Sequence, residues 1–181
     1  NEQLIQAITR AVVEQLKNNG TQPEEIGTVT ETMPEQTRSL EGKTRMRPKR
    51  SYVGAVRALQ GSDPKEIVIG VGAAFQTEIM KTIGGIPLDE VLRNVKAGIE
   101  EESMTYRVVK VMDTSDVGMM ALQSAKLSGS GIGIGIQSKG TTVIHQKDLY
   151  PLSNLELFPQ APLMTRETYR AIGRNAAKYV K

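Results

Sequence analysis

The sequence predicts an α/β protein in which an open sheet, mostly parallel or mixed, lies between helices on both of its faces. Two observations support this fold class. Short β-branched runs typical of buried strands begin near Glu66 and Tyr106, and each is followed by a predicted helix. A third strand follows the second helix, and this alternating order at this spacing favours right-handed crossovers between strands.

The first 64 residues are expected to lie outside the compact domain. Residues 3–17 have the apolar spacing of a short amphipathic helix. A helix of about 15 residues is marginal alone in water, so we expect it to dock on its own domain or on a partner. The following stretch lacks periodicity and is rich in proline. We therefore expect a docking helix at 1–18, a flexible linker at 19–64 and an α/β domain at 65–181.

The first half of the domain contains two strands and two helices. A buried strand is expected at 66–71, and an amphipathic helix runs from Leu88 to an acidic end at 100–102. That acidic end opposes the helix dipole, and we expect its carboxylates to be solvated. A second strand at 106–112 leads through N-cap residues into a helix at about 117–126.

The third strand is the most informative segment. Gly131, Gly133 and Gly135 alternate with isoleucines, so one face of the strand carries three isoleucines and the other carries no side chain. Glycine weakens a strand by roughly 0.5–1 kcal/mol per position relative to alanine. The bare face therefore indicates that either a close helix or a broad flat ligand packs on the backbone.

The remainder of the chain supplies a fourth strand, a loop and a last helix. The strand is expected at 141–145, and the irregular, apolar stretch at 149–162 is expected to lie against a surface, its own or a neighbour's. Thr165 is expected to cap a helix that continues to about 180. Cationic side chains recur every four residues along that helix and are expected to form a solvated stripe: Arg166, Arg170, Arg174 and Lys178.

The composition excludes several kinds of chemistry. The chain has no cysteine, which excludes disulfides and thiolate chemistry. Its single histidine, His145, leaves little for a metal centre or a Ser–His–Asp relay, and we expect it to be a hydrogen-bonded structural residue. The formal net charge of +3 does not indicate a nucleic-acid partner, and no apolar run approaches the roughly 20 residues that span a bilayer. We expect neither catalytic residues nor metal ligands here.

Polar side chains follow two of the predicted strands. In open α/β sheets, ligands bind beyond the carboxyl ends of the strands. Asp116 follows the second strand and Lys139 follows the third, so both are expected at that edge. The glycines match neither the G-x-G-x-x-G spacing nor a phosphate loop, so a nucleotide is not indicated.

Long, specific motifs occupy five segments of the domain: 98–102, 114–117, 127–146, 151–162 and 167–177. They resemble the medium subunit of adenosylcobalamin-dependent diol and glycerol dehydratases. The resemblance covers about 66–181, and the medium subunit of that family normally continues beyond the position of Lys181.

The resemblance implies a heterohexamer with two copies each of a large, a medium and a small subunit. Such an enzyme converts 1,2-propanediol or glycerol to an aldehyde and water. The large subunit performs the radical chemistry, so this chain would be a non-catalytic subunit of a lyase and would form the lower surface of the cobalamin site that the two share. Residues 143–148 lack the aspartate and glycine of an Asp-x-His-x-x-Gly signature, which agrees with a base-on cofactor.

By motif, the resemblance implies six cofactor contacts. Asp116 would accept a hydrogen bond from a corrin amide, unless it only caps its helix. Lys139 would meet the nucleotide-loop phosphate or a peripheral amide, with Ser138 alongside. The benzimidazole pocket would be lined by loop residues that otherwise pack on the large subunit: Leu152, Asn154 and Pro159.

Two other functions are also compatible with the sequence. The small subunit of the dehydratase-reactivating factor, a chaperone-type protein, has a similar fold and binds the large subunit. A binding module would instead use the basic segment 43–50 on nucleic acid. The helix at 1–18 resembles the extension that directs propanediol-using members into a protein-shelled bacterial microcompartment. We therefore expect a cytoplasmic location, inside such a compartment, with a shell protein as a further partner.

Overall fold

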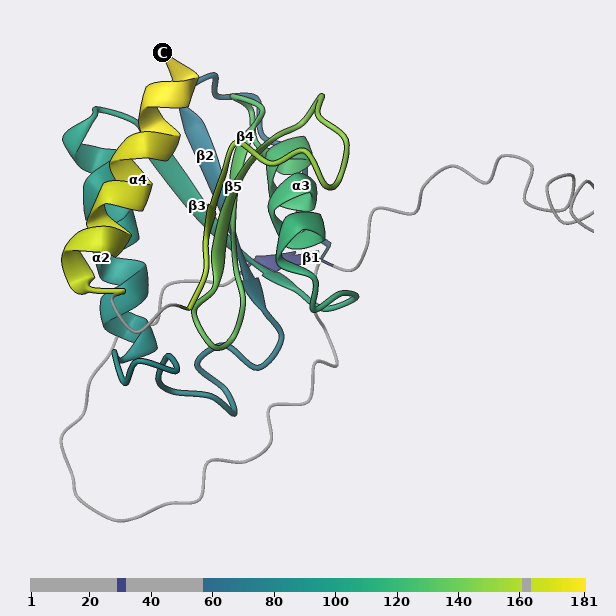
Figure 1. Cartoon of the computed structure of the whole chain (residues 1–181). Coiled ribbons are helices and arrows are strands. Elements are labelled where there is room, and N and C mark those ends of the chain that lie inside the picture. The colour runs from purple at the N-terminus through teal and green to yellow at the C-terminus, as the bar shows by residue number, and fades with distance from the viewer. Residues whose placement is uncertain (1–28, 32–56, 161–163) are drawn as a thin grey trace, which may run out of the picture.

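The computed structural model describes residues 29–31, 57–160 and 164–181, which form a six-stranded sheet with helices on both faces (Figure 1). The strand order is β1-β3-β2-β4-β5-β6. The central strand β2 is parallel to β3 and β4, and the outer pairs are antiparallel. The strands are β1 (Val29–Glu31), β2 (Glu66–Gly72), β3 (Thr105–Val111), β4 (Ile132–Ile136), β5 (Thr142–Gln146) and β6 (Glu156–Phe158).

Helices cover the sheet from two sides. Helix α3 (Val117–Leu127) lies on one face, and α2 (Leu88–Glu101) and α4 (Arg166–Val180) pack together on the other (Figure 1). The predicted fold class, a three-layer α/β arrangement with a mixed sheet, is confirmed. Strand β6 was not predicted, because three residues followed by a proline are too short to show a period. The predicted helix at 1–18 lies outside the described residues.

The isoleucine face of β4 forms the larger core. Ile132, Ile134 and Ile136 are buried together with apolar residues of α2 and α4. In α4, Tyr169 and Ile172 are fully buried. Thr165 accepts a hydrogen bond from the backbone of Thr168 and closes a capping box. Burial of this apolar face is what holds α2 and α4 against the sheet.

The ordered contacts of the domain begin before Lys65. Ala58 is buried, and the backbone N–H of Gly61 donates to the carbonyl of Leu127 at 2.7 Å. Arg107 of β3 donates to the carbonyl of Leu59 at 2.7 Å. Residues 57–64 fall within the predicted linker at 19–64. They are held by contacts with distant segments, and such contacts produce no periodic pattern in the local sequence. Strand β1 also falls within the range predicted as linker and pairs with β3.

The helices α2 and α4 touch through two glycines. A Cβ atom on Gly98 would lie 2.0 Å from the carbonyl oxygen of Arg170, and one on Gly173 would lie 2.1 Å from that of Val95. Real Cβ atoms do not approach backbone so closely, so each helix occupies the space that a side chain on the other would need. The absence of both side chains lets the two helix backbones meet.

This close approach corrects two expectations about charge. The cationic stripe of α4 is not merely solvated, because Arg170 donates to Glu101 from its Nε at 2.7 Å and Arg174 reaches the same carboxylate at 3.3 Å. Arg166 pairs with Glu90. The acidic end of α2 therefore meets cations supplied by α4. This pairing could not be predicted from the sequence, because the acidic and basic residues are about 70 positions apart.

The Glu101 pairing predicts a pH dependence of stability. The hydrogen bond from Arg170, together with the charges of Arg170 and Arg174, holds the pKa of Glu101 below its usual value. A carboxyl with a lowered folded pKa stabilises the fold fully above its unfolded pKa of about 4.3, and this contribution disappears as the pH falls through the folded pKa.

We expect a Glu101→Gln variant to be less stable than the natural chain at neutral pH, by the small amount typical of exposed ion pairs. The difference should shrink as the pH is lowered to about 3, because the Glu101 carboxyl loses its charge as the pH falls through its folded pKa. Urea unfolding at the two pH values measures it. An equal difference at both would show that the ion pairs do not stabilise the helix pair.

Candidate functional site

Helix α3 covers the glycine face of β4. A Cβ atom on Gly133 would lie 2.2 Å from the backbone nitrogen of Ala125, and one on Gly135 would lie 2.6 Å from that of Ala121. Gly70 of β2 is equally close to Ser124. The close-helix interpretation is therefore confirmed. A flat ligand on this face is excluded, because the helix backbone fills the space.

The carboxyl ends of the parallel strands carry three loops that are joined to one another. The side-chain amide of Gln137, after β4, donates to the carbonyl of Ser115, after β3, at 2.6 Å. The backbone N–H of Ile83, after β2, donates to the carbonyl of Lys139 at 3.2 Å. These bonds gather the loops after β2, β3 and β4 into one edge, which we call the carboxyl edge.

The structure places the predicted residues Asp116, Ser138 and Lys139 at the carboxyl edge. Asp116 is the N-cap of α3, and its Oδ1 accepts a hydrogen bond from the backbone of Met119 at 2.8 Å. Its Oδ2 has no hydrogen-bond partner among the described residues. Lys139 is exposed and makes no ion pair within the described ranges. Ser138 is half-buried and packs over the end of β2, where Gly72 makes room for it.

The loop after β5 brings Leu152 next to this edge. A Cβ atom on Gly118 would lie 3.1 Å from the carbonyl oxygen of Pro151 and 3.2 Å from Oδ1 of Asp116. The loop backbone therefore rests on the first turn of α3. Its tip is apolar and open, with Tyr150 83% and Leu152 89% exposed. Residues 149–162 were expected to lie against their own domain or against a neighbour. Their own domain does not cover the tip of the loop.

The two remaining predicted residues occupy different places. Pro159 is exposed and precedes Gln160, whose side chain lies next to Gly140 in the β4–β5 turn. Pro159 is thus close to the carboxyl edge. Asn154 is half-buried and makes no hydrogen bond to the edge residues within the described part of the chain.

Sequence reasoning missed the apolar side chains that flank the edge. Ile83 is 69% exposed beside Lys139, Met80 precedes it with 54% exposed, and Met119 lies directly after the capping turn of Asp116 with 36% exposed. An apolar residue in a turn, such as Ile83 before two glycines, is a signal that could have revealed this surface. The edge therefore combines unpaired polar groups with an apolar border.

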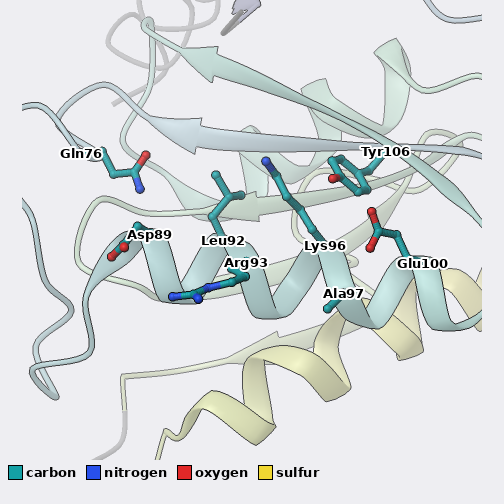
Figure 2. Close-up of a pocket in the computed structure, with 8 residues that line it drawn as sticks. All are labelled: Gln76, Asp89, Leu92, Arg93, Lys96, Ala97, Glu100 and Tyr106. Carbon is teal, nitrogen blue, oxygen red and sulfur yellow. The ribbon is translucent and has the colours of Figure 1, made fainter. Parts of the chain in front are cut away.

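A separate hollow of about 410 Å³ lies between α2 and β3 (Figure 2). The ammonium group of Lys96 lies 5.1 Å from the centre of the Tyr106 ring, a cation–π distance. Burial lowers the pKa of Lys96, against the opposing charge of Glu100, and burial followed by Glu100 raises the pKa of Tyr106. These groups interact with one another in an open groove, and no sequence pattern indicates this arrangement.

Metal and membrane sites find no support in the described ranges. Residues 57–160 and 164–181 contain no group of three or more histidine, cysteine or acidic residues that is able to hold a metal ion. Nor does any described helix have the length and apolar character needed to cross a membrane. The predicted basic segment at 43–50 lies outside the described residues.

Comparison with known proteins identifies relatives of the whole domain. The family model for the dehydratase medium subunit matches residues 58–181. Among solved structures, a glycerol dehydratase reactivase is similar with a TM-score of 0.51 and 15% identity, over 62% of this chain and 88% of that chain, which shows the fold alone. A diol dehydratase-reactivating factor complexed with ADP and Mg2+ matches with a TM-score of 0.50 and 26% identity, over 64% of this chain and 91% of that chain.

Proposed function

Because the chain belongs to the dehydratase medium-subunit family, we propose that it is the medium subunit of an adenosylcobalamin-dependent diol or glycerol dehydratase. It assembles with a large and a small subunit, two copies of each, and the large subunit carries the reacting groups. The family match over residues 58–181 is the observation that carries this proposal. A carboxyl edge with unpaired polar groups and an apolar border supports it, because such a surface suits a ligand with amides, a phosphate and an aromatic base.

The edge residues fit base-on cobalamin in three ways. Lys139 offers an unpaired ammonium to a phosphate or an amide oxygen, with the Ser138 hydroxyl beside it. The second carboxylate oxygen of Asp116 is available to an amide N–H, while the first caps α3. The benzimidazole is proposed to contact Leu152, Asn154 and Pro159, which the structure places on separate parts of the segment 150–160.

The cofactor supplies radical chemistry when it is bound. The contribution of this chain is to bind and orient it from below and to exclude water from the shared site. The cobalamin rests on the carboxyl edge and the loop after β5, and not on the glycine face of β4, which α3 covers. Substrate choice between glycerol and 1,2-propanediol belongs to the large subunit.

We expect Lys139→Ala to weaken cobalamin binding at least tenfold. A hydrogen bond to a charged group contributes about 1.5–3 kcal/mol, and 1.4 kcal/mol corresponds to a factor of ten. The measurement is the Kd for cobalamin of the complex co-expressed with large and small subunits. Lys178→Ala is the matched control, because Lys178 is exposed in the last turn of α4, near the C-terminus and far from the β4–β5 turn (Figure 1). Equal affinities for the two variants would contradict the assignment.

The alternative is the small subunit of a dehydratase-reactivating factor, and the similarity to a solved reactivating factor favours it specifically. A protein of that kind would bind the large subunit without holding cobalamin in place. Co-expression separates the two functions. A dehydratase subunit gives a complex that retains cobalamin and converts the diol, whereas a reactivating-factor subunit gives a complex that does neither.

The segment 1–18 is proposed to direct the enzyme into a bacterial microcompartment by docking on a shell protein. This segment lies outside the described residues, and the proposal rests on its amphipathic spacing. We expect deletion of residues 1–18 to leave dehydratase activity intact and to abolish packaging, measured by activity in purified compartments. A deleted enzyme that is still packaged, or one that is inactive, would contradict this role.

A further inference from the structure

A buried histidine lies directly beneath the loop that borders the carboxyl edge. His145 of β5 is fully buried, and it is the cross-strand neighbour of Gly133, so it faces the α3 side of the sheet. Its Nδ1 lies 2.8 Å from the carbonyl oxygen of Gln146, and its Nε2 lies 3.3 Å from that of Pro151. The role proposed for this chain does not yet use this side chain.

The Pro151 carbonyl is held from two sides. His145 contacts it from the sheet, and the first turn of α3 lies against it at Gly118, where a Cβ atom would be only 3.1 Å away. The same loop closes on itself through a bond from the Ser153 N–H to the Tyr150 carbonyl at 2.8 Å. It rejoins the sheet where Leu155 N–H donates to the Ile144 carbonyl at 2.9 Å.

The side chains at the tip of this loop do not pack against the rest of the domain. Leu152 and Tyr150 are almost fully exposed, so the backbone contacts beneath them set where they lie. A binding loop that is ordered before the ligand arrives loses less conformational entropy on binding.

We propose that His145 is a positioning residue, which holds the loop of residues 150–154 against α3 and so sets the place of Leu152 beside Asp116. This inference rests on the proposed function, in which that loop borders the cobalamin site. Both ring nitrogens face carbonyl oxygens, so a neutral ring donates to Pro151 when Nε2 carries the hydrogen and to Gln146 when Nδ1 carries it. The positioning role requires the tautomer with hydrogen on Nε2. A glutamine amide offers a similar donor, whereas alanine leaves both a cavity and an unpaired carbonyl.

The test compares four variants in the complex with large and small subunits, using adenosylcobalamin as the titrated ligand. His145→Ala is expected to raise the Kd for the cofactor about tenfold, with a smaller effect on kcat at saturating cofactor, and His145→Gln is expected to restore most of the affinity. Gly118→Ala displaces the same Pro151 carbonyl from the α3 side and is expected to raise the Kd as well. Lys139→Ala serves as the reference for direct contact.

A second readout separates positioning from general destabilisation. Amide hydrogen exchange at Ser153 and Leu155 should accelerate in His145→Ala, while exchange in the central strand β2 stays as in the natural chain. Exchange that accelerates equally in both places would overturn the proposal, because it would report a loss of global stability.

The remaining outcomes distinguish this inference from the proposed function. If Lys139→Ala raises the Kd while His145→Ala does not, His145 has no positioning role and the proposed function stands. A rise in Gly118→Ala alone leads to the same conclusion, because that substitution also presses on the Asp116 carboxylate. If the natural complex itself fails to bind adenosylcobalamin, the proposed function fails and this inference fails with it.

Discussion

Gly133→Ala is expected to destabilise the protein by about 3 kcal/mol or more, the upper end of what overpacking a core costs. The added methyl carbon would lie 2.2 Å from the backbone nitrogen of Ala125 and 2.6 Å from the carbonyl carbon of Ser124. These are helix backbone atoms, which cannot rotate away as a flexible side chain can. Relief requires α3 to lift from the sheet. Gly135 holds the same helix close, because a Cβ atom there would lie 2.6 Å from the backbone nitrogen of Ala121.

The measurement is urea unfolding of the natural chain, Gly133→Ala and a control. Gly84→Ala is the control, because the nearest atom to its Cβ would be Thr82 Oγ1 at 3.8 Å and Gly84 lies in an exposed turn. We expect that variant to stay within about 0.5 kcal/mol of the natural chain. If Gly133→Ala were equally harmless and instead removed cobalamin binding, the glycine face would be a ligand surface after all.

Gly98→Ala is expected to have the second large effect on stability. It should destabilise the protein, whereas helix propensity alone would predict stabilisation. In an exposed helix interior, replacing glycine with alanine stabilises by about 1 kcal/mol. Here the new methyl group would lie 2.0 Å from the carbonyl oxygen of Arg170, so α2 and α4 must separate. We expect a net loss of about 2–3 kcal/mol, together with weakening of the ion pair between Arg170 and Glu101.

Gly173→Ala tests the same contact from the other helix, because its methyl group would lie 2.1 Å from the carbonyl oxygen of Val95. One separation of the two helices relieves both clashes, so the double variant should cost less than the sum of the single ones. Thermal or urea unfolding of the three variants measures this. A stabilised Gly98→Ala would show that α2 and α4 are not in backbone contact.

The strands and helices were predictable because their signals are local. The run at Glu66–Gly72 is rich in isoleucine and valine, as expected of a central parallel strand buried on both faces. Helix α3 begins where Asp116 supplies a side-chain acceptor, and α4 begins at the capping residue Thr165. Each of these features can be read within a window of a few residues.

The contacts between elements were not predictable in the same way. The alternation in β4 indicates that something packs on the backbone, but a helix and a flat ligand produce the same pattern in a single strand. The choice depends on where α3 crosses the sheet, and the small residues Ala121, Ser124 and Ala125 reveal that crossing only once the register is known. The pairing of Gly98 with Gly173 likewise joins helices that are far apart in the sequence.

The candidate site was predictable in part for the same reason. Asp116 and Lys139 were placed at the carboxyl edge from the order of parallel strands alone, and the structure has them there. The contact between His145 and the Pro151 carbonyl is not indicated by any local sequence pattern. The apolar border formed by Ile83 and Met119 emerges only from the fold.

The most direct measurement is an experimental structure of this chain assembled with large and small dehydratase subunits in the presence of adenosylcobalamin. The corrin is predicted to lie between the large subunit and the carboxyl edge, with Lys139 and Asp116 at its polar groups and Leu152 against its base. Helix α3 should remain on the glycine face of β4. A cofactor held elsewhere, or a carboxyl edge covered by protein without cofactor, would contradict the account.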